Sequence, residues 1–352
     1  MLALVSIDSM VPERHPLRQV KPVVDDILRG LSPTFDAMYA EGGRPSIPPE
    51  RLLKSMLLMA FFSVRSERLL AEAVGYNMLF RWFLDMDLTE PAFDASTFAK
   101  NRDRLLEHDV ARLFFDAVVA HARGKGWLSS EHFSVDGTLI EAWASMKSFR
   151  PKDDDKGDNN GFGDFKGTKR SNDTHESKTD PEAKLFRKGK GHEAKLAYME
   201  HALMENRNGL VVDVEVTQAT GTAEREAAIA MLERERASRG TPAPRRVTVA
   251  ADKAYDVRSF IARCRALRVT PHVAQNVHAR RSSGIDRRTT HHLGYAASTV
   301  LRRLIEKIFG WQKTTGGLRR SRFRGLKRTS FFAMISTAAF NLIRMTKMQT
   351  AT

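Results

Sequence analysis

The chain has 352 residues, of which 42% are hydrophobic, so it can bury a substantial core and is not intrinsically disordered. Its single cysteine, Cys264, excludes a disulfide scaffold and any multi-cysteine metal site, and is typical of the reducing cytoplasm. With 57 Lys and Arg against 42 Asp and Glu, the net charge is +15, which predicts a polyanionic partner.

Residues 46–124 are predicted to form several short helices. Leu and Met recur at helical spacing after Pro48, Ser66 is a suitable N-cap for a second helix, and a pair of glycines ends the last one. Such a set forms a small helical domain, which we place at residues 1–125. Two roles stay open for it: a DNA-binding variant of the helix-turn-helix, or a dimerisation and packing domain.

After this region, strands begin to alternate with helices. Residues 131–141 predict a strand that ends at Asp136, and residues from 147 to about 195 are polar, glycine-punctuated and mixed in charge, which predicts a flexible surface insertion. Two strands joined by a hairpin follow, and then helix, strand, helix, strand and helix. This order predicts an α+β fold, with an antiparallel three-stranded unit extended into a mixed sheet flanked by helices, at residues 126–345.

The positive charge is concentrated near the C-terminal end of the sequence. Residues 1–100 contain 11 Lys and Arg and 13 acidic residues, whereas residues 276–328 contain 14 Lys and Arg and only two acidic residues, Asp286 and Glu306. Like charges at this density repel one another unless a partner neutralises them, which favours a phosphate-binding surface. No apolar run approaches the ~20 residues that a membrane-spanning helix needs, so nucleic acid is the expected partner and a membrane is not.

Three acidic residues are candidates for chemistry beside this basic surface. Asp136 and Asp252 each follow an apolar strand, and catalytic groups gather at strand ends in such sheets, although either aspartate alone is typical of a turn. Glu306 lies in a predicted helix, on one stripe with Arg302 and Lys313. Three carboxylates near a basic surface predict metal-dependent phosphoryl transfer, in which two Mg²⁺ ions about 3.5–4 Å apart activate water and stabilise the leaving oxygen.

Other chemistries find less support in the sequence. The 11 histidines show no spacing typical of a zinc hydrolase, and no phosphate-binding glycine loop is present. Trp311 follows the apolar stripe of the last predicted helix, so we expect it in the core, with stacking on an unpaired base as the alternative.

Eight sequence motifs follow one another along nearly the whole chain. They are VPERHPLR, RPSIPPERLLKSMLL, DASTFAKNRDRLL, FSVDGTLIEAWAS, YMEHALMENRNGLVVDVEVTQATG, ADKAYD, IDRRTTHHLGYAAS and RRLIEKIFGWQKTTGGLRRSRFRG. In this order they resemble the DDE transposases of bacterial insertion sequences, in the group named after insertion sequence five, within the wider insertion-sequence-four-like superfamily. Each motif alone is weak, and their shared order makes the resemblance specific.

The resemblance implies a ribonuclease-H-like core with a mixed five-stranded sheet, preceded by the helical N-terminal domain. It places the catalytic and metal-binding triad of the family at Asp136, Asp252 and Glu306. The terminal tyrosine, arginine, glutamate and lysine signature of the family matches at Arg302, Glu306 and Lys313, and Thr299 stands at the tyrosine position. It also implies DNA phosphate contacts from Arg302, Lys313, Arg319, Arg320, Arg322 and Arg324.

The function implied is that of a DNA transposase, which binds the terminal inverted repeats of its element, cuts them with two Mg²⁺ ions, or with Mn²⁺ as substitute, and transfers the freed end into target DNA. Its partners are double-stranded DNA and, on that DNA, a second copy of the chain. Its place is the bacterial cytoplasm, at the nucleoid when bound to DNA. Two alternatives stay open: a DNA-binding relic or regulator that no longer cuts, and a ribonuclease-H-like repair nuclease that needs no particular end sequence.

Overall fold

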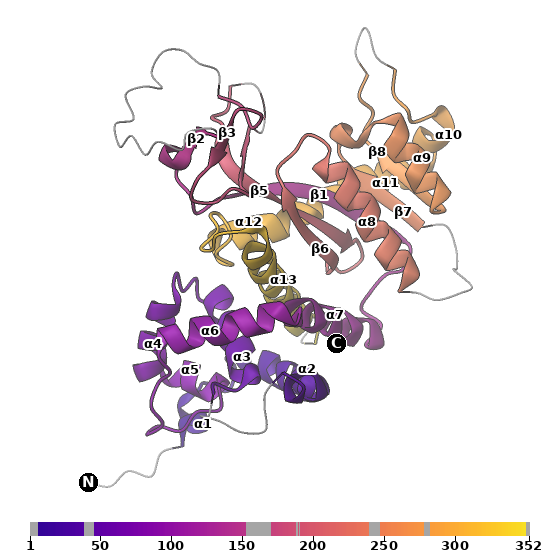
Figure 1. The fold of residues 1–352 in the computed structure, drawn as a ribbon. Coiled ribbons are helices and arrows are strands. Elements are labelled where there is room, and N and C mark those ends of the chain that lie inside the picture. The colour runs from indigo at the N-terminus through magenta and orange to yellow at the C-terminus, as the bar shows by residue number, and fades with distance from the viewer. Residues whose placement is uncertain are drawn as a thin grey trace.

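The computed structural model describes residues 6–38, 46–152, 170–187, 189, 191–238, 247–277 and 282–349. Within these ranges, a group of helices precedes the first strand (Figure 1). They are α1 (Ile7–Met10), α2 (Leu17–Asp36), α3 (Pro49–Phe61), α4 (Glu67–Tyr76), α5 (Met78–Phe83), α6 (Ala95–Glu107) and α7 (Val110–Gly124).

The helices predicted between residues 46 and 124 are confirmed, and local chemistry explains where they begin. Pro49 is the first residue of α3, where its missing N–H has no intrahelical partner to lose. Ser66 caps α4, since its hydroxyl accepts a hydrogen bond from the backbone N–H of Leu69 at 3.1 Å.

The described strands form one six-stranded mixed sheet and a separate two-stranded sheet. The six strands are β1 (His132–Glu141), β4 (Lys184–Phe186), β5 (Lys195–Glu205), β6 (Val211–Gln218), β7 (Val247–Ala251) and β8 (Val269–Val273). Strand β5 is antiparallel to both β1 and β6, whereas β1, β7 and β8 are parallel. The order β6-β5-β1-β7-β8 is that of a ribonuclease-H-like core, and the predicted α+β fold class is confirmed.

Two details of the sheet differ from the prediction. A sixth strand is present, because β4 pairs with the first residues of β5. Strand β1 also does not end at Asp136: it continues to Glu141, so Asp136 and Gly137 lie in mid-strand and not in a turn. The antiparallel pairing with β5, which runs the whole way to Glu141, supplies the hydrogen bonds that carry the strand past the glycine.

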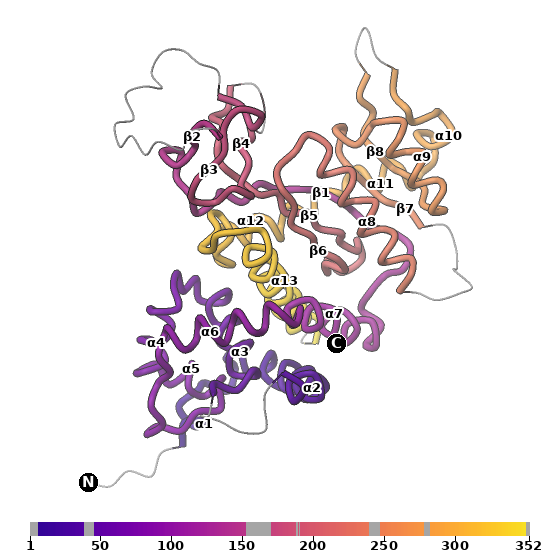
Figure 2. Tube along the Cα trace, in the orientation of Figure 1, coloured from indigo at the N-terminus to yellow at the C-terminus, as the bar shows by residue number. Residues whose placement is uncertain are grey.

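The predicted insertion at residues 147–195 contains regular structure. The two-stranded sheet pairs β2 (Phe149–Pro151), which follows the short 3-10 helix η1 (Met146–Ser148), with β3 (His175–Ser177), and lies beside β4 in Figure 2. Buried Asp180 ties this part to the main sheet by accepting a hydrogen bond from the Tyr198 hydroxyl at 2.6 Å. Residues 153–169, on which the prediction of flexibility mainly falls, lie outside the described residues.

Helices cover both faces of the main sheet. On one face lie α8 (Ala223–Ala237) and α9 (Arg258–Ala266); on the other lies α13 (Leu326–Gln349), which also packs against α3 and α7 (Figure 1). The N-terminal helices therefore share one hydrophobic core with that face. None of the described helices is long and apolar enough to cross a lipid bilayer.

The last predicted helix of the sheet region is divided into three segments. The order is α11 (Leu293–Leu301), the 3-10 helix η3 (Arg302–Ile305) and α12 (Glu306–Thr314), after the short helix α10 (Arg287–Thr290). A 3-10 segment inside a helical run often marks a functional hinge. Here it begins at Arg302 and ends directly before Glu306, two residues that a single α-helix would place on one face.

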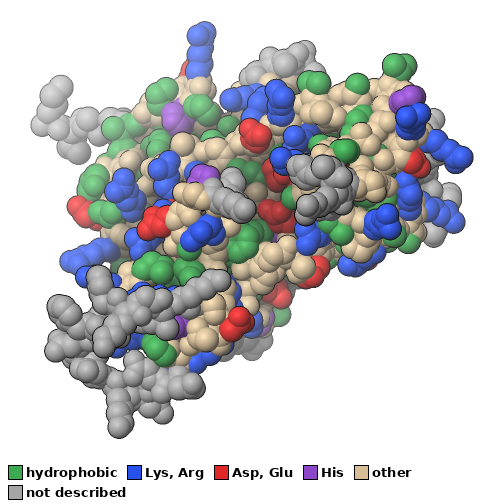
Figure 3. Space-filling model, turned by 90° about the horizontal axis from the view of Figure 1, so that it is seen from above, with side chains coloured by type: hydrophobic (Ala, Val, Ile, Leu, Met, Phe, Trp, Pro, Cys, Tyr) green, Lys and Arg blue, Asp and Glu red, His purple; other side chains and the backbone are tan. Residues whose placement is uncertain are grey.

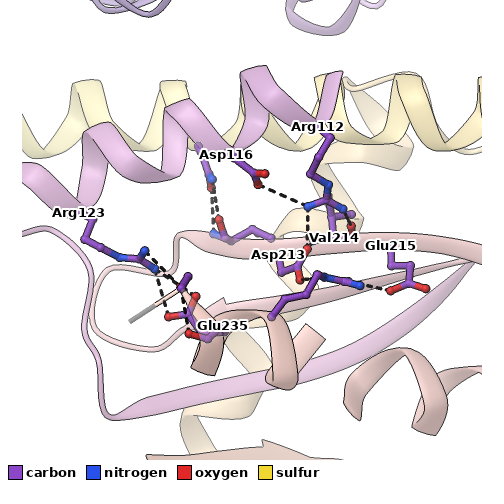
Figure 4. Close-up of polar contacts among 11 residues, drawn as sticks. Arg112, Asp116, Arg123, Asp213, Val214, Glu215 and Glu235 are labelled. Carbon is purple, nitrogen blue, oxygen red and sulfur yellow. Dashed lines mark hydrogen bonds and ion pairs between the residues drawn. The ribbon is translucent and has the colours of Figure 1, made fainter. Parts of the chain in front are cut away.

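A network of ion pairs joins α7 to the opposite elements of the sheet (Figure 4). Asp213 of β6 is buried, with 4% of its surface exposed, and its two oxygens accept hydrogen bonds from Arg112 of α7 at 2.8 Å and Arg234 of α8 at 2.7 Å. Further along α7, Arg123 pairs with Glu235 at 3.1 Å. Because the carboxylate of Asp213 is desolvated, it depends on both cations for its stability.

Candidate active site

Strands β1 and β7 bring two of the predicted acidic residues to the same level of the sheet. The parallel register pairs Ser134 with Ala250. Two residues further along the chain in each case are Asp136, still within β1, and Asp252, directly after the end of β7. The side chain of Asp252 accepts a hydrogen bond from the backbone N–H of Ala254 at 2.7 Å and caps the 3-10 helix η2 (Lys253–Tyr255). Two carboxylates are therefore held by a rigid sheet with their charges near each other.

The pKa of Asp136 shows the electrostatic state of this pair. Burial is the main cause that raises this pKa to about 7, and the negative charges of Asp252 and Glu224 act in the same direction, against the lowering effects of the Gly137 N–H and the Arg302 guanidinium. The Gly137 N–H donates to Asp136 Oδ1 at 2.8 Å. The carboxyl group of Asp136 is therefore desolvated and lies within reach of two other negative charges.

Glu306, the third predicted member of the triad, stands apart from the two aspartates. It is the first residue of α12 and its side chain is exposed. Segment η3, directly before it, packs against β1, and the charge of Arg302 in that segment acts on Asp136. The structure thus brings Asp136, Asp252 and Arg302 together, with Glu306 at the exposed end of the same segment.

Lys313, the last residue of the predicted signature, points toward the sheet. Its Nζ donates a hydrogen bond at 2.5 Å to the hydroxyl of Thr138, which lies two residues after Asp136 and on the same side of β1. Thr299, at the tyrosine position of the signature, is exposed, and its hydroxyl donates to the backbone carbonyl of Tyr295 at 3.0 Å. Lys313 therefore reaches the strand that carries Asp136.

The predicted arginines after α12 fall into two groups. Arg319, Arg320 and Arg324 are exposed. Arg322 instead donates to the backbone carbonyl of Val64 and stacks on the ring of Phe332, at 5.1 Å from the ring centroid. These contacts give Arg322 the geometry of an anchor between the N-terminal helices and α13, and not that of a phosphate contact.

The tryptophans also separate into a core residue and a surface residue. Trp311 packs against the ring of Phe340 at 5.9 Å in the hydrophobic core, as expected. Trp143, two residues after β1, is 44% exposed, and the guanidinium of Arg324 lies 4.4 Å from its ring centroid. The sequence analysis did not single out Trp143, because its position two residues beyond a strand does not show whether the ring is buried.

The sequence analysis also missed three polar residues around Gly137. They are Glu224, in the first turn of α8, Tyr255 of η2 and His201 of β5. Tyr255 and His201 are fully buried, and among the described residues neither the hydroxyl of Tyr255 nor Nδ1 of His201 has a hydrogen-bond partner. The motif ADKAYD contained one available signal, since it places Tyr255 three residues after Asp252.

The donor set of this site fits a hard divalent cation. Asp136 and Asp252 supply carboxylate oxygens, which Mg²⁺ prefers, and the charge of Asp252 acts on the carboxyl group of Asp136. As their side chains stand, no three Asp, Glu, His or Cys residues in the described part of the chain lie close enough to hold one ion. The fit therefore rests on the chemistry of the donors and not on a complete coordination shell.

A second carboxylate with a raised pKa lies behind Lys313. Glu200 of β5 is 1% exposed, and burial raises its pKa to about 7, against the lowering effects of a hydrogen bond from Gln312 and the charge of Lys313. The Gln312 amide donates to Glu200 Oε1 at 2.7 Å. Because the folded-state pKa exceeds the ordinary value of 4.5, the folded protein binds this proton more tightly than the unfolded chain does.

The variant Glu200→Gln tests this linkage through the pH dependence of stability. In the wild type, Glu200 does not lower the free energy of unfolding below about pH 4.5, where its carboxyl group is protonated in both states. As the pH rises toward 7 the unfolded chain ionises first, and the free energy of unfolding falls by about 3 kcal/mol. Glu200→Gln cannot ionise, so we expect it to be more stable than the wild type at pH 8 and similar at pH 5, in urea unfolding. Equal pH profiles for the two proteins would contradict this, and exposed Glu226→Gln is the control.

Comparisons with known proteins assign the sequence to a family. A family model described as "Transposase domain (DUF772)" matches residues 5–104, and one described as "Transposase DDE domain" matches residues 128–342. No curated protein matches the sequence.

Two solved structures illustrate how remote the similarity to known structures is. A piggyBac transposase synaptic complex with hairpin DNA is 10% identical, with a TM-score of 0.43, over 96% of this chain and 76% of that one. A pre-cleavage Mos1 transpososome is 11% identical, with a TM-score of 0.23, over 86% and 80%. The family match carries the assignment: since the DDE-domain model spans well over half of the sequence, the chain belongs to the DDE transposases, metal-dependent enzymes that cut and join DNA.

Proposed function

We propose that this transposase binds the terminal inverted repeats of its own insertion sequence and catalyses Mg²⁺-dependent strand cleavage and strand transfer at the Asp136–Asp252 pair. The observation that carries this proposal is the placing of the two carboxylates at one level of neighbouring parallel strands, with charges that act on each other. Such a pair attracts a divalent cation, and a cation there can act on a DNA phosphate.

In this proposal Asp136, Asp252 and Glu306 hold two Mg²⁺ ions, for which Mn²⁺ can substitute. When bound, the ions supply an activated water and a stabilised leaving oxygen. Asp136 and Asp252 provide rigid ligands, since both are fixed by the sheet. Glu306 is the ligand from the helical side, and Arg302, whose charge already reaches Asp136, holds the phosphate beside the pair.

The DNA is proposed to lie over the basic residues around this site. Figure 3 shows Lys and Arg side chains spread across one face of the molecule, with some Asp and Glu among them. Lys313, Arg319, Arg320 and Arg324 are the proposed phosphate contacts near β1. Residues 1–125 are proposed to bind end DNA or a second copy of the chain, and residues 126–345 to form the catalytic domain. The proposed setting is the bacterial cytoplasm, on the nucleoid.

Trp143 is proposed to stack on a base of the bound DNA. Its ring is exposed, and Arg320 fixes the backbone there by donating to the carbonyls of Ala142 at 3.0 Å and Trp143 at 2.7 Å. Stacking on an aromatic side chain contributes about 1–3 kcal/mol for each base. We therefore expect Trp143→Ala to weaken DNA binding roughly tenfold, measured by fluorescence anisotropy with end DNA, and Trp143→Phe to retain most of the affinity.

The salt dependence of binding separates stacking from charge. Trp143→Ala leaves the slope of log affinity against log salt unchanged, whereas Arg324→Ala lowers that slope by about one, because one phosphate contact is lost. An unchanged affinity for Trp143→Ala, with folding intact, would contradict the stacking role.

The proposed function is tested by cleavage of a duplex that carries the element's own end. With Mg²⁺ we expect a nick at the end boundary, and with EDTA or scrambled end DNA we expect none. Tight binding without cutting under any divalent cation would favour a regulator or relic. Cutting that ignores the end sequence would favour a repair nuclease.

A further inference from the structure

The first turn of α8 brings another carboxylate to the Asp136–Asp252 pair. Glu224 is the second residue of α8, and this helix packs across the face of the sheet that contains Gly137. A Cβ atom added to Gly137 would lie 3.2 Å from both Cγ and Oε1 of Glu224. The side chain of Glu224 therefore rests directly on the backbone of β1, one residue from Asp136.

The glycine at position 137 is what permits this approach. The φ angle of Gly137 is not in the left-handed region, so the backbone of β1 does not require glycine there. The close contact with Glu224 favours it, because a Cβ at 137 would meet Cγ and Oε1 of Glu224 at 3.2 Å, which is tighter than an ordinary van der Waals contact. Asp136 thus supplies a carboxylate, and Gly137, which has no side chain, leaves room beside it for Glu224.

Two buried polar atoms beside Glu224 point to a ligand. Among the residues that the structure describes, the hydroxyl of Tyr255 has no hydrogen-bond partner, and the charges of Glu224, Asp136 and Asp252 all reach it. Nδ1 of His201 is likewise unpaired within the described ranges, and it lies 3.1 Å from the same point above Gly137 that Glu224 approaches. Both residues are 0% exposed. An unpaired buried polar group destabilises the fold, so two of them near Glu224 indicate a position for a ligand.

We propose that Glu224 is a fourth carboxylate of the catalytic site and binds a divalent cation together with Asp136 and Asp252. This inference rests on the proposed function and adds a ligand that the acidic triad lacks. Mg²⁺ binds through a few carboxylates and retains several waters, so three carboxylates from β1, β7 and α8 form a suitable set. A cation removes the electrostatic repulsion among the three carboxylates.

Tyr255 and His201 are positioning residues in this arrangement. Both lie against the carboxylates without touching solvent, so they can hold a ligand oxygen or a metal-bound water in place. Nε2 of His201 is already hydrogen-bonded to the Thr217 hydroxyl at 2.8 Å, so Nδ1 is the ring atom that faces Glu224.

The test is Mn²⁺ binding by the full chain without DNA. Binding is measured as the decrease in the electron paramagnetic resonance signal of free Mn²⁺. We expect Glu224→Gln to weaken Mn²⁺ binding roughly 10-fold to 100-fold, the usual effect of losing a metal-supporting group. The matched control is Glu226→Gln, two residues along the same helix and exposed, which we expect to bind within twofold of the wild type. Asp252→Asn is the positive control: it shows how far the Mn²⁺ affinity falls when a carboxylate ligand of the proposed site is removed.

The outcomes separate this inference from the proposed function. Wild-type Mn²⁺ affinity in Glu224→Gln, with a loss in Asp252→Asn, would overturn the role of Glu224 and leave the aspartate pair standing. Wild-type affinity in both, or no Mn²⁺ uptake by the wild type, would overturn both. Gly137→Ala is the second variant: its methyl group shifts the Glu224 side chain by a few tenths of an ångström, so we expect modestly weaker Mn²⁺ binding with every carboxylate still present, and unchanged binding would contradict the inference.

Discussion

Replacing either Asp136 or Asp252 with alanine is expected to lower DNA cleavage roughly 10³-fold or more while the protein still binds end DNA. Each variant removes a carboxylate ligand from the proposed cation site and leaves the basic surface intact. Asp136 is half-buried with a raised pKa, so its loss removes an unfavourable charge and is not expected to unfold the sheet. The measurement is a single-turnover cleavage rate with Mg²⁺ on a duplex that carries the element's end.

Binding and its salt dependence are the controls for this prediction. Neither aspartate is a phosphate contact, so the salt slope of both variants should match the wild type. Glu226→Ala, an exposed acidic residue outside the pair, should cut at the wild-type rate. Retained cleavage in Asp136→Ala or Asp252→Ala would show that the site has been assigned to the wrong residues.

Replacing Asp213 with alanine is expected to destabilise the protein by about 3 kcal/mol, the largest loss of stability that we predict. Asp213 is buried and accepts hydrogen bonds from Arg112 and Arg234, so its removal leaves the two guanidinium groups with only their outer partners, Asp116 and Glu215 (Figure 4). Breaking a buried ion pair costs about 3–5 kcal/mol, and the lower end applies because both arginines are partly in water. Urea unfolding at pH 7 measures the change.

The matched control is Asp26→Ala, which removes an exposed ion pair with Arg29. Exposed pairs within a helix contribute at most about 0.5 kcal/mol, so this variant should unfold close to the wild type. A loss of similar size in both variants would show that burial of Asp213 is not the cause. Because the network joins α7 to β6 and α8, proteolysis between α7 and β1 should also become faster in Asp213→Ala.

The strand order and the aspartate pair could be predicted from sequence because their signals are local. A buried strand followed by a carboxylate is visible in a few residues, and two such strands in one parallel arrangement bring Asp136 and Asp252 to one level. The mid-strand position of Asp136 was missed because Asp-Gly is a common turn signal. Only the pairing of β1 with β5 shows that the chain continues straight through it.

Helix α13 shows a second reason why an element of the fold could not be predicted from the sequence. Its sequence gives no amphipathic period, since the helix is buried among the sheet, α3 and α7. Ser and Thr interrupt its apolar run, yet they are satisfied inside the protein: the Thr337 hydroxyl donates to the Ala333 carbonyl at 2.8 Å. Periodicity therefore could not distinguish this helix from a short apolar stretch.

Glu224 could not be selected from sequence for a different reason. Acidic residues are frequent in the first turn of a helix, where they interact favourably with its dipole. In the sequence, Glu224 therefore indicates only the beginning of a helix. Its nearness to Gly137 depends on how α8 crosses the sheet. In the same way, the sequence RRSRFRG does not show that Arg322 points inward to Val64 while Arg324 stays exposed beside Trp143.

The central claim, that the Asp136–Asp252 site cuts and joins DNA as a transposase, is tested most directly by strand transfer from a pre-cut end. A labelled duplex that ends in the 3′-OH of the element is incubated with the protein, Mg²⁺ and a target plasmid. We predict that the label becomes covalently joined to the plasmid by the wild type, and not with EDTA or by Asp252→Ala. Efficient nicking of intact ends without any joining of the pre-cut end would contradict the claim.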